Sequence, residues 1–161
     1  MIVERGHGVP IIVVPGLQGR WEWMGPAIDA LATYGRVVTY SLADERSSGF
    51  PCDPARGFES YLAQLDAVFA EAAVERAVLV GVSYGGLVAA EFAARHPGRT
   101  LGLVLASALP MGWTPDARAR FYLRAPRLLS PLFVLSSPLR MYPELRARSH
   151  GKPLVRSSAS E

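Results

Sequence analysis

The fold of this chain is decided by the stretch Ala77-Val78-Leu79-Val80-Gly81-Val82-Ser83-Tyr84-Gly85-Gly86-Leu87-Val88-Ala89-Ala90. An apolar run followed by glycines and an alanine-rich run predicts a buried strand, a tight turn and a helix. The pattern Gly-x-Ser-x-Gly places Ser83 at the tip of the turn, where the glycines leave no side chains to clash. A short motif of this kind is also found in ordinary turns. The flanking strand and helix favour the interpretation of Ser83 as a nucleophile.

Two main-chain amides are candidates to stabilise negative charge next to Ser83. The N–H of Tyr84 is the first amide after the serine, and the helix that follows adds the positive end of its dipole. The second candidate is the N–H of Leu17, in the glycine-containing loop after the apolar run 9–14. Both loops follow buried strands, so in a parallel sheet they reach the same carboxyl edge. The alternative for the loop at 15–19 is a plain strand-to-helix connection.

The rest of the first 110 residues alternates strand and helix patterns. Further strands are predicted at 9–14, 36–42 and 101–107, with a short one at 1–4, and helices at 26–34, 58–74 and 84–95. In the helix 58–74 the apolar residues recur at the spacing of one face, and Gln64, Asp66 and Glu71 lie off that stripe. This order predicts an α/β fold, with a mostly parallel sheet covered by helices on both faces.

The composition of the sequence changes at Pro110, since seven of the thirteen prolines lie from Pro110 to Pro153. Short apolar and arginine-bearing pieces alternate there, and no strand of the earlier kind recurs. We therefore predict a core at 1–110, a helical cap or lid at 111–150 and a frayed tail at 151–161.

Composition narrows the functional class. No apolar run reaches the length of a membrane span, and the start of the chain lacks the pattern of a signal peptide. A single cysteine, Cys52, excludes an internal disulfide and a cysteine-rich metal site. These features predict a soluble, cytoplasmic protein that does not bind membranes.

The net charge of +3 is unevenly distributed, since residues 1–109 hold 8 basic and 11 acidic side chains and residues 110–161 hold 9 and 3. A basic segment is compatible with nucleic-acid binding. No aromatic and basic interleaving or known binding module accompanies it, so we expect no nucleic-acid partner.

Four pieces of the chain together resemble the α/β-hydrolase fold family. They are Val13 to Gly19, the acidic Ser-Gly loop from Asp44 to Gly49, the elbow from Gly81 to Gly86, and the strand end from Ser107 to Pro110. The elbow is the specific piece, and Pro15 stands where many members have histidine. The resemblance covers about residues 9 to 110 and implies a partial α/β-hydrolase fold with Ser83 as nucleophile.

The resemblance also implies a catalytic acid and a histidine that follow the serine in the chain. Within these 161 residues Asp116 and His150 are the candidates for that acid and base. Asp116 stands at a predicted helix start, which favours a role in stabilising the helix terminus. No strand is predicted to position His150. We therefore expect a C-terminally truncated chain that has little or no turnover, because a serine hydroxyl is a poor nucleophile without a base.

The function that the resemblance implies is hydrolysis of a small ester, thioester, amide or carbon–carbon bond, without metal or organic cofactor. The alternative is a non-catalytic ligand-binding or regulatory protein on the same fold. A further expectation concerns the strand at 101–107, whose outer edge would be unpaired and apolar. Such an edge favours self-association.

Overall fold

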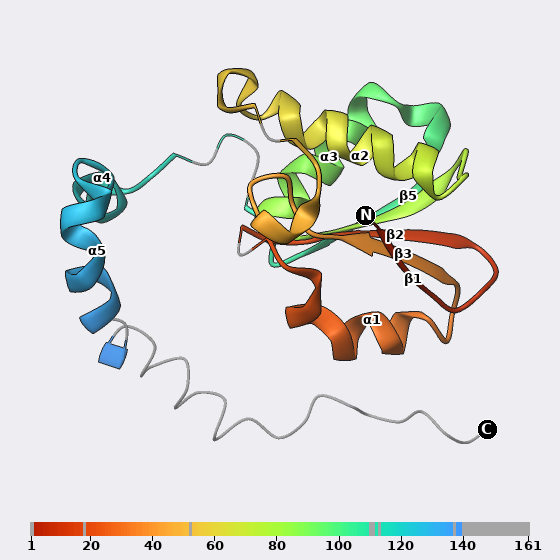
Figure 1. Cartoon of the computed structure of the whole chain (residues 1–161), viewed down its shortest axis with the longest axis horizontal. Helices are drawn as coiled ribbons and strands as arrows, with labels where there is room; N and C mark the ends of the chain where they lie inside the picture. The colour runs from red at the N-terminus through yellow and green to blue at the C-terminus, as the bar shows by residue number, and fades with distance from the viewer. Residues whose placement is uncertain are drawn as a thin grey trace. The chain divides into compact units, whose positions relative to one another are not determined.

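A computed structural model of the chain describes residues 2–17, 19–51, 53–109, 112, 114–136 and 138–139. The chain divides into two compact units, residues 1–113 and residues 114–161 (Figure 1). The first unit holds the sheet and its covering helices. The second holds the described helices α4 and α5.

The elements occur in the order that the sequence predicts. The strands are β1 (Ile2–Arg5), β2 (Pro10–Val14), β3 (Arg36–Tyr40), β4 (Ala77–Val82) and β5 (Thr100–Ala106). The α-helices are α1 (Gly25–Leu31), α2 (Glu59–Glu71), α3 (Tyr84–Arg95), α4 (Ala117–Leu123) and α5 (Pro126–Leu135). Short 3-10 helices are η1 (Trp21–Met24), η2 (Arg46–Ser48), η3 (Pro54–Arg56) and η4 (Pro97–Arg99). The predicted elements are therefore confirmed, with ends that differ by a few residues.

The five strands form one sheet in the order β1-β3-β2-β4-β5. Strand β1 pairs antiparallel with β3, and the other three pairings are parallel. The elbow strand β4 lies between β2 and β5, with Val14 opposite Gly81 and Val82 opposite Ala106. The predicted, mostly parallel sheet is confirmed. Because β2, β4 and β5 run the same way, the loops that follow them meet at one edge.

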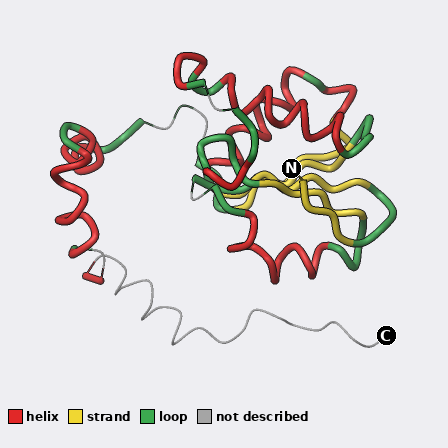
Figure 2. The backbone as a smooth tube through the Cα atoms, in the orientation of Figure 1, coloured by secondary structure: helices red, strands yellow, loops and turns green. Residues whose placement is uncertain are grey.

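Helices cover both faces of the sheet, as predicted (Figure 2). Alternate residues of β2 point to opposite sides, which is the period of a strand. Ile12 and Val14 join the buried cluster that packs against α2 and α3, whereas Val13 joins the smaller cluster on the side of α1.

Helices α2 and α3, which pack against the larger cluster, are also joined by hydrogen bonds between the start of α2 and the end of α3. The guanidinium of Arg95 on α3 donates two hydrogen bonds to the carboxylate of Glu59 on α2, at 2.8 and 2.9 Å. It also donates to Glu91 at 2.8 Å. These hydrogen bonds raise the pKa of Arg95, and the bond from Arg95 lowers the pKa of Glu59. The pairs are exposed, so they orient α2 against α3 more than they stabilise the fold.

One side chain of α2 lies in an environment that periodicity does not indicate. Gln64 is off the apolar stripe, yet only 3% of it is exposed. Its Nε2 donates to the carbonyl oxygen of Ser41 at 2.8 Å. The side chain is therefore buried where α2 meets the chain directly after β3, because the carbonyl oxygen of Ser41 is there to accept its hydrogen bond.

Strand β5 is the last strand of the described sheet, next to β4 alone. Its apolar side chains are substantially exposed, with Val104 at 50% and Leu105 at 51%. Strand β5 therefore lies at the edge of the described sheet, which is the position predicted for the strand at 101–107. Self-association through it stays a prediction.

In the second unit, α4 and α5 pack through aromatic side chains. The ring centroids of Tyr122 and Phe133 lie 5.2 Å apart, edge to face. The helical content predicted for 111–150 is present where that range is described, and its role as a cap stays a prediction. Residues 151–161 lie outside the described part of the chain. Among the described helices, none combines the length and the hydropathy that crossing a bilayer requires.

Candidate active site

Ser83 stands between the end of β4 and the first turn of α3. Its backbone is in a left-handed conformation, with φ 52° and ψ −118°, which is rare for a residue with a side chain. The Ser83 N–H donates to the carbonyl oxygen of Ala106 at 2.9 Å, and its carbonyl oxygen accepts from the N–H of Gly86 at 3.0 Å. The predicted sharp turn is therefore present, and hydrogen bonds with β5 and α3 hold it.

Glycines make this turn possible because main chain approaches them closely. A Cβ on Gly81 would lie 2.5 Å from the Cα of Gly86 and 2.6 Å from the carbonyl oxygen of Gly85. A Cβ on Gly85 would overlap the carbonyl oxygens of Val14 and Pro15. Helix α3 can therefore start directly against the ends of β2 and β4. That contact brings Ser83 to the edge of the sheet.

The strained backbone of Ser83 predicts a difference between two variants that both lack the hydroxyl. We expect the free energy of unfolding of Ser83→Gly to exceed that of Ser83→Ala by about 1 kcal/mol, because glycine adopts a positive φ without steric cost. Urea unfolding followed by circular dichroism measures the difference. Equal stabilities would contradict a strained corner.

The loop that follows β2 lies beside the serine. A Cβ on Gly16 would be 3.3 Å from the Cβ of Ser83 and 3.8 Å from its Oγ. The loop is closed by a hydrogen bond from the Gly19 N–H to the Gly16 carbonyl oxygen, at 2.8 Å. Leu17 lies within this turn and is 64% exposed. The two predicted oxyanion donors, the N–H groups of Leu17 and Tyr84, therefore belong to segments that meet at one edge.

A cavity of about 540 Å³ opens beside Ser83. Its described lining comes from the loop after β2, from η1 and from the elbow: Gly16, Leu17, Gly19, Arg20, Trp23, Met24, Val82 and Ser83. Most of these side chains are apolar, and Arg20 carries the one charge among them. Sequence analysis did not single out Arg20, Trp23 or Met24, because only the folding of η1 over the loop brings them to the serine.

The loop after β3 supports the loop after β2 from the other side. The N–H of Leu42 donates to the carbonyl oxygen of Gly19 at 2.7 Å. A Cβ on Gly19 would be 3.1 Å from the Cβ of Glu45. Within the loop, Ser48 Oγ accepts from the N–H of Phe50 at 3.0 Å. The side chain of Ser48 therefore stabilises a turn within this loop.

The side chain of Tyr84 lies among aromatic rings at the start of α2. Its ring centroid is 5.4 Å from that of Tyr61 and 6.2 Å from that of Phe58. Partial burial raises the pKa of the Tyr84 phenol, and the negative charge of Asp44 raises it further. The phenol therefore stays neutral at physiological pH and adds no negative charge beside Ser83.

The sequence predicts Asp116 and His150 as the acid and the base. Asp116 belongs to the second unit, where its carboxylate accepts the N–H of Ala119 at 2.7 Å and caps α4. This is the helix-start role that its position predicted. His150 lies outside the described residues.

The other two histidines lie at the far edge of the sheet. His7 precedes β2 and His96 precedes β5, whereas Ser83 follows β4. Since these strands are parallel, both histidines are at the amino edge and Ser83 is at the carboxyl edge. The ring centroid of His96 lies 4.5 Å from that of Phe92, on the inner side of α3. Neither histidine is placed to act on Ser83.

Comparison with known proteins matches this chain to one family model and to curated hydrolases. A sequence model described as the Alpha/beta hydrolase family matches residues 11–159. The "Putative carbamate hydrolase RutD" of Azorhizobium caulinodans is 31% identical over 148 residues, which cover 86% of this chain and 53% of that protein. The 2-hydroxy-6-oxo-2,4-heptadienoate hydrolase of Pseudomonas putida is 30% identical over 110 residues, covering 66% of this chain and 40% of that protein.

A solved structure extends this likeness to the fold. A marine microorganism esterase superposes with a TM-score of 0.66 at 23% identity, covering 77% of this chain and 48% of that one. The chain spans about half the length of the curated relatives that it matches.

Proposed function

The chain belongs to the alpha/beta-hydrolase family, and from that premise we propose that it is a serine hydrolase with Ser83 as its nucleophile. The observation that supports the proposal is the left-handed backbone of Ser83 at the mouth of a cavity, directly beside Gly16. Strain of this size persists only where the surrounding structure holds it, and such residues cluster at reactive sites.

In the proposed reaction, Ser83 Oγ forms a bond to the carbonyl carbon of the substrate. The electron pair of the carbonyl bond moves to its oxygen, and the N–H groups of Tyr84 and Leu17 donate to that oxyanion. Each such donor contributes about 3 kcal/mol to transition-state stabilisation. The N–H groups at the start of α3 have no carbonyl before them in the helix, so the helix terminus favours the negative charge. The oxyanion then collapses and expels the leaving group, which takes up the proton that the base removed from Ser83. Attack of water on the resulting acyl-serine releases the acid and returns the proton to Ser83.

The proton of Ser83 requires a base, for which His150 is the candidate from the sequence, with Asp116 as the candidate acid. His7 and His96 are at the amino edge of the sheet, away from Ser83, so slow turnover is expected unless His150 supplies the base. An oxyanion hole without a base still gives a residual rate. The absence of a cofactor requirement and a cytoplasmic location stay predictions from the sequence.

The proposed substrates are small esters, thioesters, amides or compounds cleaved at a carbon–carbon bond. The names of the relatives support this range, since a carbamate and a 2-hydroxy-6-oxo-2,4-heptadienoate both contain a carbonyl group. A carbonyl carbon is the atom that an activated serine attacks.

Covalent labelling tests the proposed nucleophile. A fluorophosphonate probe is expected to modify the wild-type chain at Ser83, as mapped by mass spectrometry of the peptides, and to leave Ser83→Ala unmodified. Ser47 and Ser48 in the loop after β3 serve as internal controls, because neither has a strained backbone. An unmodified wild-type chain, or labelling shared equally among serines, would contradict the proposal and favour the non-catalytic ligand-binding alternative.

A further inference from the structure

We propose that Arg20 makes the cavity beside Ser83 selective for substrates that carry a carboxylate as well as the carbonyl that Ser83 attacks. This inference rests on the proposed function, because it assigns the substrate class of the same site. The observation that carries it is the charge of the lining, since Arg20 is the single charged residue among the described residues around this cavity.

The carboxylates that act on Arg20, those of Glu22 and Glu45, are not part of the described lining of the cavity. Arg20 Nη2 lies 3.3 Å from Glu22 Oε1, but Glu22 is not part of the described lining. Both side chains are roughly half exposed, so the pair is solvated and weak. A guanidinium has five N–H donors in a fixed fork, and one long contact to Glu22 leaves most of them available for a second carboxylate.

The neighbouring hollow shows that this charge pattern is particular to the site. That hollow, of about 550 Å³, is lined by the loop after β3 and contains Asp44, Glu45 and Arg46 together. Charges of both signs give it no preference for an anion. In the cavity beside Ser83, Arg20 and the positive end of α3 belong to the lining itself and favour negative charge there. The acidic side chains of Asp44 and Glu45 lie outside the described lining, beside Gly19.

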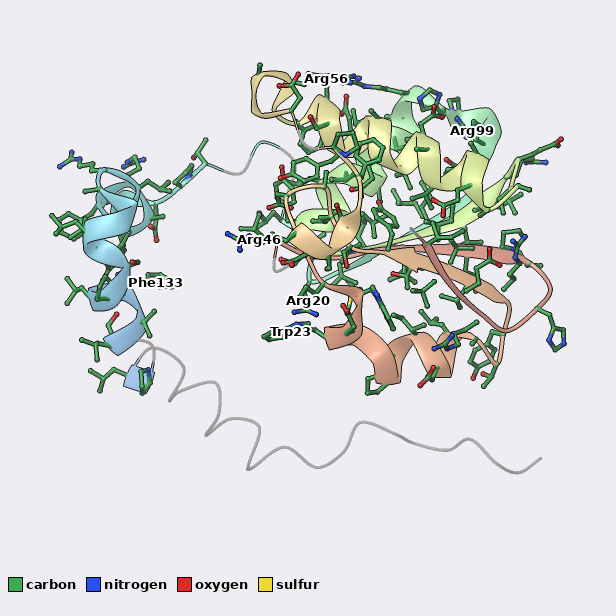
Figure 3. All side chains as sticks on the ribbon, viewed as in Figure 1. Arg20, Trp23, Arg46, Arg56, Arg99 and Phe133 are labelled. Carbon is green, nitrogen blue, oxygen red and sulfur yellow. The ribbon has the colours of Figure 1, made fainter. Side chains whose placement is uncertain are left out.

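The rest of the lining fits a short apolar spacer between the two polar ends of such a substrate. Apolar surface in the same cavity comes from Leu17, Trp23, Met24 and Val82. Figure 3 shows Arg20 and Trp23 on the segment before α1, at the side of the first unit where the strands β2 and β4 end. A half-ester of a short dicarboxylic acid has this sequence of groups, with a carbonyl, a few methylenes and a carboxylate.

Binding of two matched esters tests the inference without requiring turnover. Monomethyl glutarate and methyl pentanoate share the ester and the number of acyl carbons, and only the first has a carboxylate. We expect the Ser83→Ala chain, followed by NMR titration of the tryptophan indole N–H signals, to bind monomethyl glutarate about tenfold more tightly than methyl pentanoate. Arg20→Gln should remove this preference, and Arg20→Lys should keep part of it.

Arg56→Gln is the matched control, since Arg56 is an exposed arginine on η3 that does not line the cavity (Figure 3). Its preference for the half-ester should equal that of the parent. Equal binding of the two esters by the parent, or an equal loss in Arg20→Gln and Arg56→Gln, would overturn the inference. Fluorophosphonate labelling of Ser83 reports separately on the nucleophile, so the two proposals fail by different measurements.

Discussion

Gly85→Ala is expected to lower the free energy of unfolding by about 3 kcal/mol or to prevent folding altogether. The added Cβ would overlap the carbonyl oxygens of Val14 and Pro15. These atoms are main chain at the end of β2, so they can give way only if α3 moves off the sheet. Urea unfolding monitored by circular dichroism measures the loss. Fluorophosphonate labelling of any folded fraction reports whether the elbow keeps its geometry.

Gly98→Ala is the matched control for this prediction. A Cβ on Gly98 would meet nothing within 4 Å, so its effect is expected within about 0.5 kcal/mol of wild type. If Gly85→Ala were no more destabilising than Gly98→Ala, the close approach of α3 to β2 described above would be wrong.

Phe92→Ala is expected to lower the free energy of unfolding by about 3–5 kcal/mol, the range for a buried aromatic side chain. Phe92 is 1% exposed and stacks on Phe69 of α2, with ring centroids 5.2 Å apart. The guanidinium carbon of Arg99 lies 4.4 Å from the ring centroid of Phe69 and 5.3 Å from that of Phe92. Removing the ring therefore leaves a cavity between α2 and α3 and exposes the partner ring.

The same denaturation experiment on Tyr34→Ala provides the comparison. Tyr34 is also aromatic and belongs to the same unit, but it is 83% exposed, so its removal should cost less than about 0.5 kcal/mol. A loss for Phe92→Ala that matched the loss for Tyr34→Ala would show that the packing between α2 and α3 contributes little to stability.

The catalytic proposal and the substrate inference depend on features of different origin. The strained Ser83 is held by its hydrogen bonds with Ala106 and Gly86 and by the close approach of main chain to the glycines of the elbow. The cavity is lined by the elbow together with the loop after β2 and η1, which lie some sixty residues earlier in the chain. Substitutions in η1 should therefore change which esters bind while leaving the reactivity of Ser83 toward a small fluorophosphonate largely unaffected.

The sequence by itself determined the elements and the corner that holds Ser83. Strand and helix patterns depend on apolar spacing along the chain. The requirement for glycine at Gly81 is also local, because a Cβ there would meet Gly85 and Gly86, whereas the requirement at Gly85 comes from the distant carbonyl oxygens of Val14 and Pro15. The role of Asp116 as a helix cap was predictable for the same reason, because its partner, the N–H of Ala119, is three residues away.

Only the tertiary structure decided which distant residues share the site. Arg20, Trp23 and Met24 reach the cavity because β2 and β4 are adjacent and parallel, so that the segment after β2 folds beside the elbow. Gln64 is buried because the carbonyl of Ser41 lies opposite it. The periodicity of apolar residues indicates on which side of its own helix or strand a residue lies. Burial and charge at a site depend instead on the strand order and on the loops that pack across the site. These are set by contacts between residues far apart in the chain.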